Sequence, residues 1–336
     1  MSKPFSSLVP ATGMMYLGFP GLPTGGQSYF VDPYYGGDGN TGKRPDKPVK
    51  TLAHALDMAT AGQNDIVYLM ARSNTGIYTT DYQDATLDWN KDGVHLIGIN
   101  AGPMLGQRSR VAFSASYVTA SNLFTMTANN CLVANVEFYA GVASVNPTGC
   151  MKMLGDRNHF VNCQISGIGD DLMDTAGAYS LWMYGAHENL FEGCYIGLDT
   201  ISRGSAANAE ILLTAPSNAG NMRNVFRKCM VAGWCMSASN YLFLSANAAG
   251  AIGRWLLFDD CVFHNTGTSV ATGVQMTQAF QVHAAAGGHI ILHNTTIIGA
   301  DNVNATDTGL VLVGAGGLAN NTEQTDLGLA VVTTNA

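Results

Sequence analysis

The sequence is poor in charge. Only 12% of its 336 residues are Asp, Glu, Lys or Arg, whereas 47% are apolar. An ordinary soluble domain carries about 25% charged residues, and disordered chains combine low hydrophobicity with high net charge, so the composition argues against disorder. The 16 basic residues form no cluster larger than an adjacent pair such as Lys43 and Arg44, and the net charge is −8. Nothing in the sequence would neutralise a row of phosphates, and we therefore expect no nucleic-acid binding.

Long apolar runs and paired cysteines are lacking as well. No run approaches the roughly 18 apolar residues that a membrane span requires, and residues 1–17 lack a basic segment followed by an apolar one, so we expect neither a membrane span nor a secretory signal. The seven cysteines are odd in number and contain no C-x-x-C pair. This argues against a disulfide framework or a zinc site. We expect reduced, buried cysteines in a protein assembled in a cytoplasm.

The sequence does contain an irregular repeat of about 30 residues. Each copy has a polar residue, two or three apolar residues, a polar pair, a small residue, one variable position and then Ile, Val or Phe. The clear copies are Asn158–Ile165, Asn189–Ile196, Asn224–Val231, Trp255–Phe263 and His289–Ile297, and a weaker copy is Leu132–Phe138. Aligned, their small-residue column is Val136, Cys163, Cys194, Cys229, Cys261 and Thr295.

Each repeat also contains a second apolar segment, and the repeats show no helical spacing of their apolar residues. These segments are Met151–Leu154, Leu181–Tyr184, Ile211–Leu213, Tyr241–Leu244 and Phe280–Val282. Strands this short can bury an inner face only by stacking coil on coil, which predicts a parallel β-helix with the small-residue column as a ladder inside it. Leucine-rich and ankyrin repeats need a helix in every unit, and propellers need four strands. Low charge further suggests flanks covered by sister chains, with Trp182, Trp234 and Tyr241 buried between subunits.

Four regions are predicted along the chain. Residues 1–28 are rich in Pro and Gly and form either an extended attachment arm or a disordered leader. Residues 29–92 form the N-terminal cap of the β-helix, residues 93–299 the coils, and residues 300–336 a segment that closes the solenoid or reaches a neighbouring chain. The cap contains a helix at 51–61 with Thr51 as its N-cap. The apolar residues of the arm are Phe5, Met14, Met15, Tyr16 and Phe19.

The cap region carries a resemblance to a known fold family. A strand ending in Val31-Asp32-Pro33 is followed by the loop Gly36–Gly42, the lead Pro45–Thr51, the helix and the strand Asp65–Leu69. This order resembles the N-terminal cap of right-handed parallel β-helix proteins of the pectin-lyase-like superfamily, as in phage tailspikes and related virion proteins. The resemblance implies an all-β, single-stranded right-handed parallel β-helix with one N-terminal capping α-helix. It also implies a homotrimer.

One acidic loop is the candidate for catalysis. It contains Asp170, Asp171 and Asp174, and paired carboxylates are what glycoside hydrolysis needs. Gly169-Asp170-Asp171 resembles a fragment of the polygalacturonase pattern, but the companion motifs N-T-D, G-H-G and R-I-K are missing. Pectate lyases of the superfamily add a basic residue, for which Arg203 or Arg223 could serve. The alternative is a solvated or calcium-stabilised turn without catalysis, which we favour.

Other polar groups give weaker signals. The loop residues Asp32, Asp38 and Asn40 could hold Ca²⁺ through oxygen ligands but lack EF-hand spacing, so we expect no cofactor. His289 and His293 share a strand face about 13 Å apart, which excludes a shared metal. The pairs Arg227-Lys228 and Asp259-Asp260 should meet as an ion pair between neighbouring coils.

Two functions from different classes follow. The first is a non-catalytic phage virion protein, a homotrimeric capsid decoration or head spike attached by its N-terminal arm, assembled in the host cytoplasm. Its partners would be further copies of itself and phage capsid or tail proteins, with cell-surface glycan as a further candidate. The second is a tailspike-type glycan depolymerase, a hydrolase or lyase that uses the loop around Asp170 and Asp171.

Overall fold

The computed structural model describes residues 26–71, 73–74, 77–78, 80–100, 109–117, 122–216, 220–269, 273–304, 310–314 and 331–332. The arm residues Phe5, Met14, Met15, Tyr16 and Phe19 lie outside this part of the chain. Within it, no helix is long and apolar enough to cross a membrane.

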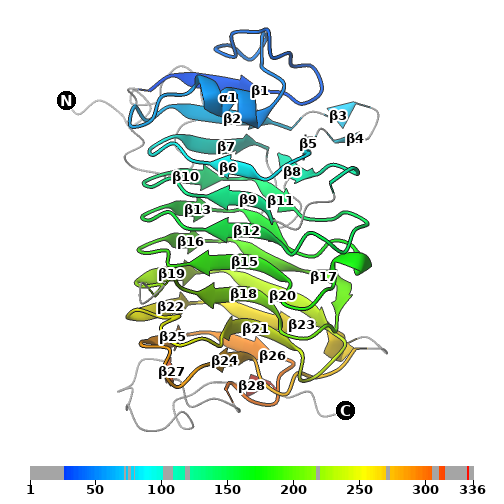
Figure 1. Cartoon of the computed structure of the whole chain (residues 1–336), viewed down its shortest axis with the longest axis vertical. Coiled ribbons are helices and arrows are strands. Elements are labelled where there is room, and N and C mark those ends of the chain that lie inside the picture. The colour runs from blue at the N-terminus through cyan, green and yellow to red at the C-terminus, as the bar shows by residue number, and fades with distance from the viewer. Residues whose placement is uncertain are drawn as a thin grey trace, which may run out of the picture.

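The chain folds as a single right-handed parallel β-helix whose strands stack along one long axis (Figure 1). The first sheet contains β1 (Ser28–Val31), β2 (Ile66–Met70), β7 (His95–Ile99), β10 (Leu132–Ala134), β13 (His159–Val161), β16 (Leu190–Glu192), β19 (Asn224–Arg227), β22 (Trp255–Asp259), β25 (His289–His293) and β27 (Leu310–Gly314).

The second sheet contains β5 (Thr80–Gln83), β8 (Arg110–Phe113), β11 (Glu137–Tyr139), β14 (Gln164–Ser166), β17 (Tyr195–Arg203), β20 (Met230–Cys235), β23 (Val262–Asn265), β26 (Thr296–Ile298) and β28 (Val331–Val332). The third contains β6 (Leu87–Trp89), β9 (Asn122–Met126), β12 (Gly149–Met153), β15 (Tyr179–Tyr184), β18 (Asn208–Thr214), β21 (Tyr241–Ala246) and β24 (Phe280–Val282). An antiparallel pair, β3 (Ser73–Asn74) and β4 (Ile77–Tyr78), stands apart from these sheets. The predicted fold class is confirmed.

A sharp corner divides each repeat segment into two strands. At this corner one residue adopts a left-handed backbone conformation, and the chain passes from the first sheet to the second. The corner residues are Asn135, Asn162, Gly193, Lys228, Asp260 and Asn294, with φ between 44° and 59°. Asn and Gly tolerate this conformation best. The polar pair of the sequence repeat is therefore a turn, and each coil has three strands.

The small-residue column follows this corner directly and lies inside the solenoid. Val136, Cys163, Cys194, Cys229, Cys261 and Thr295 are all at most 6% exposed. Each thiol of the column lies within hydrogen-bond distance of a carbonyl oxygen of the preceding coil, as Cys194 Sγ does with Phe160 O at 3.5 Å. Burial raises the pKa of Cys194 and Cys229 well above that of a free thiol. The column therefore places small side chains on the inner side of the corner.

We expect the seven thiols to be inert in the folded protein. All seven are free and buried, and burial raises the pKa of Cys131 to about 12 and that of Cys235 to about 11. Since the thiolate is the reactive form, a disulfide reagent at pH 8 should modify less than about one thiol per chain until denaturant is added. Counting modified thiols by absorbance before and after unfolding checks this. Rapid modification of the native protein would contradict the buried column.

Two further ladders run through the core. Phe160, Phe191, Phe226 and Phe258 form a phenylalanine stack, with ring centroids 4.9, 4.8 and 4.6 Å apart and rings within 14° of parallel. A buried asparagine ladder is formed by Asn158, Asn189 and Asn224, which come two residues before Phe160, Phe191 and Phe226 in the sequence. Each carboxamide oxygen accepts a hydrogen bond, 2.9 Å long, from a backbone N–H group of the preceding coil. The ladder satisfies backbone groups at the turns that lead into the first sheet, where burial without a partner would be costly.

The helix α1 (Leu52–Met58) packs against β1 and β2 at the N-terminal end of the solenoid (Figure 1). Thr51 is its N-cap, as predicted, because its side chain accepts a hydrogen bond from His54 N at 3.2 Å. The helix is shorter than the predicted 51–61, since Ala59 is already extended. The cap region is also part of the solenoid, because β1, β2, β5 and β6 belong to the three sheets.

Asp81, at the N-terminal end of the solenoid, is expected to make the free energy of unfolding depend on pH. It is 2% exposed, its carboxylate accepts from Leu52 N at 3.1 Å, and burial raises its pKa to about 7. Below pH 4 the carboxyl is protonated whether folded or unfolded. Between pH 4 and 7 only the unfolded chain ionises it, so stability falls as pH rises, by up to about 4 kcal/mol, and the penalty is constant above pH 7.

Replacement of Asp81 by Asn should remove this penalty while keeping an oxygen that accepts from Leu52 N. We expect D81N to gain stability relative to the parent between pH 5 and pH 8, measured by urea unfolding at both values. An exposed control on α1, D57N, should show no such gain. Parallel pH profiles for D81N and the parent would contradict the assignment.

Candidate functional site

The predicted acidic loop lies between β14 and β15, at the edge where the second sheet passes to the third. Asp170 is the N-cap of a short 3-10 helix, η2 (Asp171–Met173), and its Oδ1 accepts from Leu172 N at 2.9 Å. Asp171 is exposed. The carboxylate of Asp170 is therefore used to fix the local backbone, whereas that of Asp171 faces solvent.

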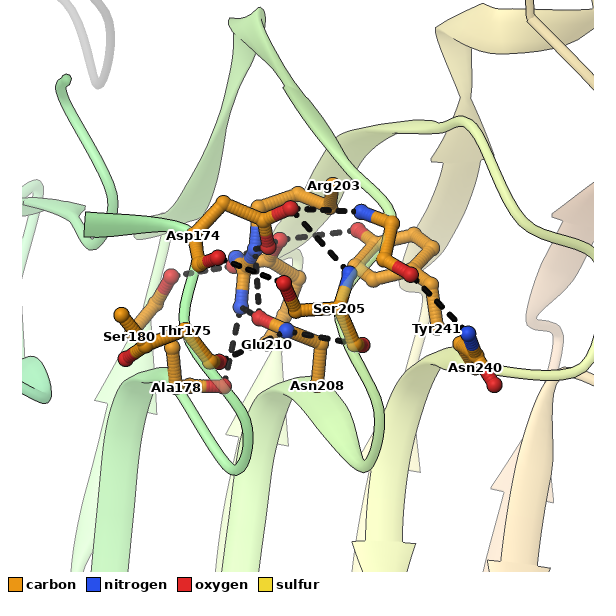
Figure 2. A network of polar contacts seen from close by, with 11 residues as sticks. Asp174, Thr175, Ala178, Ser180, Arg203, Ser205, Asn208, Glu210, Asn240 and Tyr241 are labelled. Atoms are coloured by element: carbon orange, nitrogen blue, oxygen red, sulfur yellow. Dashed lines mark hydrogen bonds and ion pairs between the residues drawn. The ribbon is translucent and has the colours of Figure 1, made fainter. Parts of the chain in front are cut away.

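Asp174 ties this loop to the next coil. Its Oδ2 accepts from the backbone N–H groups of Gly204 at 2.9 Å and Ser205 at 3.1 Å, and its carbonyl oxygen accepts from Ser205 Oγ at 2.6 Å. Its other carboxylate oxygen lies 3.8 Å from Arg203 Nε. These contacts hold the loop of one coil against the corner of the following one (Figure 2).

Behind Asp174 lies a buried ion pair between Arg203 and Glu210 (Figure 2). Arg203 is 1% exposed, Glu210 is 0% exposed, and Nη1 of Arg203 lies 2.8 Å from Oε1 of Glu210. The remaining guanidinium donors reach Asn208 Oδ1 at 2.8 Å from Nε and Ala178 O at 2.9 Å from Nη2. A buried charge pair is tolerated only when such additional hydrogen bonds complete it.

Glu210 receives two further hydrogen bonds from the neighbouring strands of the third sheet. Tyr241 donates its hydroxyl to Oε1 at 2.8 Å, and Ser180 donates to Oε2. Burial, and then the adjacent Glu210 carboxylate, raise the pKa of Tyr241 well above its usual value, which keeps the phenol protonated as a donor. We term Asp174, Ser180, Arg203, Asn208, Glu210 and Tyr241 the buried polar network.

Glycines of the second sheet make room for the network. A Cβ on Gly197 would lie 2.9 Å from the Glu210 carboxylate, and one on Gly233 would collide with the Tyr241 hydroxyl. Tyr241 is 0% exposed within its own chain, so the expectation that it is buried between subunits is wrong. Arg203 is the last residue of β17, and the pairing of β17 with β20 shifts in register between Leu198 and Ser202.

The two arginines proposed from the sequence as basic partners of the acidic loop lie in different places. Arg203 joins the acidic loop through Asp174, whereas Arg223 pairs with Glu188 of the preceding coil, which also pairs with Arg157 at 2.7 Å. The sequence reasoning missed Glu210. The available signal was a carboxylate directly before the apolar segment Ile211–Leu213, within a strand that should be buried.

The candidate calcium loop is held by hydrogen bonds from its own polar side chains. Asp32 Oδ1 accepts from Tyr34 N and Tyr35 N at 3.0 Å, and Asp38 Oδ1 accepts from Lys50 N at 2.8 Å. Asn40 uses its amide nitrogen to donate to Pro48 O at 2.7 Å. Across the described ranges, no three His, Cys, Asp or Glu side chains are grouped to hold a metal ion. These three residues fix the backbone of the loop.

The predicted ion pair between coils is confirmed in part. Arg227 Nε lies 3.2 Å from Asp259 Oδ2. His293, which belongs to the coil after that of Asp259, places its Nδ1 2.7 Å from Asp259 Oδ1. Lys228 and Asp260 occupy the left-handed corner instead. His289 and His293 lie on the same strand, β25, as expected.

The chemistry open to solvent is limited by this arrangement. Arg203 and Glu210 are too deeply buried for a substrate to contact them, and Asp174 is 16% exposed with its carboxylate held by the next coil. Asp171 is the member of the acidic loop that solvent reaches most freely. The buried polar network therefore orders the edge between the second and third sheets.

Comparisons with known proteins bear on the fold. The sequence matches no protein-family model and no curated protein. The structure is similar to a pectin methylesterase from Aspergillus niger, with a TM-score of 0.51 and 13% identity over 95% of this chain and 93% of that one. It is also similar to pectin methylesterase PemA from Erwinia chrysanthemi, with a TM-score of 0.50 and 13% identity over 82% of this chain and 80% of that one. The chain thus shares the parallel β-helix fold of these two enzymes.

Proposed function

We propose that the chain is a non-catalytic structural protein of a phage particle, a homotrimeric β-helical capsid decoration or head spike. The main support for the proposal is that two carboxylates of the acidic loop accept hydrogen bonds from backbone N–H groups of the solenoid. Asp170 caps η2 and Asp174 accepts N–H bonds from Gly204 and Ser205, so these carboxylates build the solenoid and are not poised over a substrate. The resemblance of residues 29–69 to virion β-helices supplies the phage context.

Particle association tests this function. Residues 1–28 are proposed as the attachment arm, so the full chain should copurify with phage particles at a fixed number of copies per particle, whereas a chain lacking residues 1–25 should remain unbound. Quantitative mass spectrometry of gradient-purified particles measures both. A chain absent from particles would contradict the structural role, and retention of the truncated chain would contradict the arm.

Glycan depolymerisation is the second candidate, favoured by the exposed Asp171 carboxylate in a fold shared with pectin methylesterases. If it is correct, the protein should shorten capsular polysaccharide, measured by size-exclusion chromatography, and D171A should abolish the effect. The exposed control D57A should retain it. Polysaccharide of unchanged length would count against this candidate and for the structural one.

A further inference from the structure

The loops that join the second sheet to the third carry exposed apolar side chains. Seven large apolar or aromatic side chains are exposed in the described part of the chain, and four of them lie in these loops. The four are Val145, Leu172, Met236 and Val274, with exposed fractions of 58, 51, 40 and 37%. The loops follow one another along one long edge of the solenoid (Figure 1). An apolar row therefore runs along this edge.

Hydrogen bonds join each of these loops to the next. We term the five loops the loop ridge, and they comprise residues 140–148, 167–178, 204–207, 236–240 and the described part of 266–279. The bonds run from Gly169 N to Ala140 O at 2.7 Å, from Gly204 N to Asp174 Oδ2 at 2.9 Å, from Asn240 Nδ2 to Gly204 O at 3.0 Å and from Thr277 N to Ala238 O at 2.8 Å. The apolar side chains are thus presented by loops whose relative positions are fixed, which lowers the entropy lost on binding a partner.

The apolar side chains are distributed symmetrically along the loop ridge. They lie on the first, second, fourth and fifth loops, whereas the middle loop, 204–207, consists of Gly, Ser and Ala. Neighbouring strands are about 4.8 Å apart, so the pattern spans about 19 Å with the middle loop at its centre. A pattern that is the same from both ends matches a second copy of itself after a rotation of 180°. Val145 of one copy then faces Val274 of the other, and Leu172 faces Met236.

The charges of the loop ridge favour an antiparallel contact over a parallel one. Its charged residues are Asp170, Asp171 and Asp174, which all belong to the second loop. In a parallel contact the acidic loops of two copies would face each other, and like charges at such a distance are unfavourable. In an antiparallel contact the acidic loop, with its exposed Asp171, faces residues 236–240, which carry no charge.

We propose that the loop ridge is a self-association surface, through which two copies of the chain pair side by side and antiparallel. The twofold axis of the pair passes the middle loop, 204–207. A ridge of five loops is short for a permanent interface, so the association is reversible, with a dissociation constant on the order of 100 µM. The pairing goes beyond the proposed function. A trimer with its three arms at one end joins its chains in parallel, whereas the loop ridge joins chains that point in opposite directions, such as chains of two different trimers.

Cysteine crosslinking tests the direction of the contact. Full chains carrying V145C or V274C, one of them with a size tag, are mixed and treated with a short bis-maleimide, which should not modify the buried native thiols. We expect the mixture to form crosslinked pairs at least about tenfold faster than either variant alone, because the two positions face each other. In a parallel contact they are four coils apart, about 19 Å.

The matched control is Y82C mixed with V274C, since Tyr82 is 64% exposed on β5 and lies off the loop ridge. This mixture should react no faster than the single variants. Crosslinked pairs of V145C with itself would show a parallel contact, and equal rates in all mixtures would show that the loop ridge makes no contact. Either result would overturn the proposal.

Truncation of one apolar side chain measures what the loop ridge contributes to the association. Each residue occurs twice in a twofold contact, so L172S should raise the dissociation constant by about tenfold or more. Y82S removes an exposed ring elsewhere and should leave the constant unchanged. Sedimentation equilibrium measures association beyond the species present in dilute solution. An equal constant for L172S and the parent would contradict the proposal. Since both experiments use the purified chain, their outcome does not depend on whether it binds a phage particle.

Discussion

Replacement of Arg203 by methionine is expected to lower the free energy of unfolding by about 3–5 kcal/mol. The change leaves Glu210, which is 0% exposed, with a buried negative charge and no cation. It also removes the donors to Asn208 Oδ1 and Ala178 O. Urea unfolding followed by circular dichroism at pH 7 measures the loss.

Two comparisons show that the loss comes from the unpaired charge. R203M combined with E210Q removes the charge as well, so about 2 kcal/mol of the loss should be recovered. R254M removes an exposed arginine and should change stability by less than about 0.5 kcal/mol. If R203M is no more destabilising than R254M, or if the added E210Q deepens the loss, the ion pair does not stabilise this corner.

The fold could be predicted because short apolar segments recur along the sequence, and each of them forms one strand or a pair of strands of a coil. The spacing of Cys163, Cys194 and Cys229 reports the stacking of coils, and the apolar segments such as Leu181–Tyr184 coincide with strands of the third sheet. The corner inside each repeat was not predicted. It depends on left-handed residues as unlike as Asn162 and Lys228, whose conformation is imposed by the strands on both sides.

The buried polar network could not be predicted from spacing. Its members come from different coils, and the loops between the second and third sheets differ in length, so the register that brings Asp174 against Gly204 is a property of the folded solenoid. The acidic loop was found because three acids are close in sequence. Their roles as a cap and a tether are visible only once the next coil is in place.

Replacement of Phe191 by alanine is expected to cost about 3–5 kcal/mol, as large a loss as that of the ion pair. Phe191 is 0% exposed in the middle of the phenylalanine stack, with Phe160 at 4.9 Å and Phe226 at 4.8 Å between ring centroids. The coils are held at a fixed spacing by strand pairing on both sides, so the cavity cannot close by collapse. The midpoint and slope of urea unfolding give the free energy.

The matched controls are a smaller truncation at position 191 and the removal of an aromatic ring at an exposed position. F191L keeps most of the volume and should lose less than about half of the F191A effect, whereas Y82A removes an aromatic ring that is 64% exposed and should change stability by less than about 0.5 kcal/mol. Since each coil contacts only its neighbours, a cavity at this central position should divide the solenoid into two less coupled halves. F191A should therefore also broaden the unfolding transition; a loss as small as that of Y82A, with the transition unchanged, would show that the stack does not couple the coils.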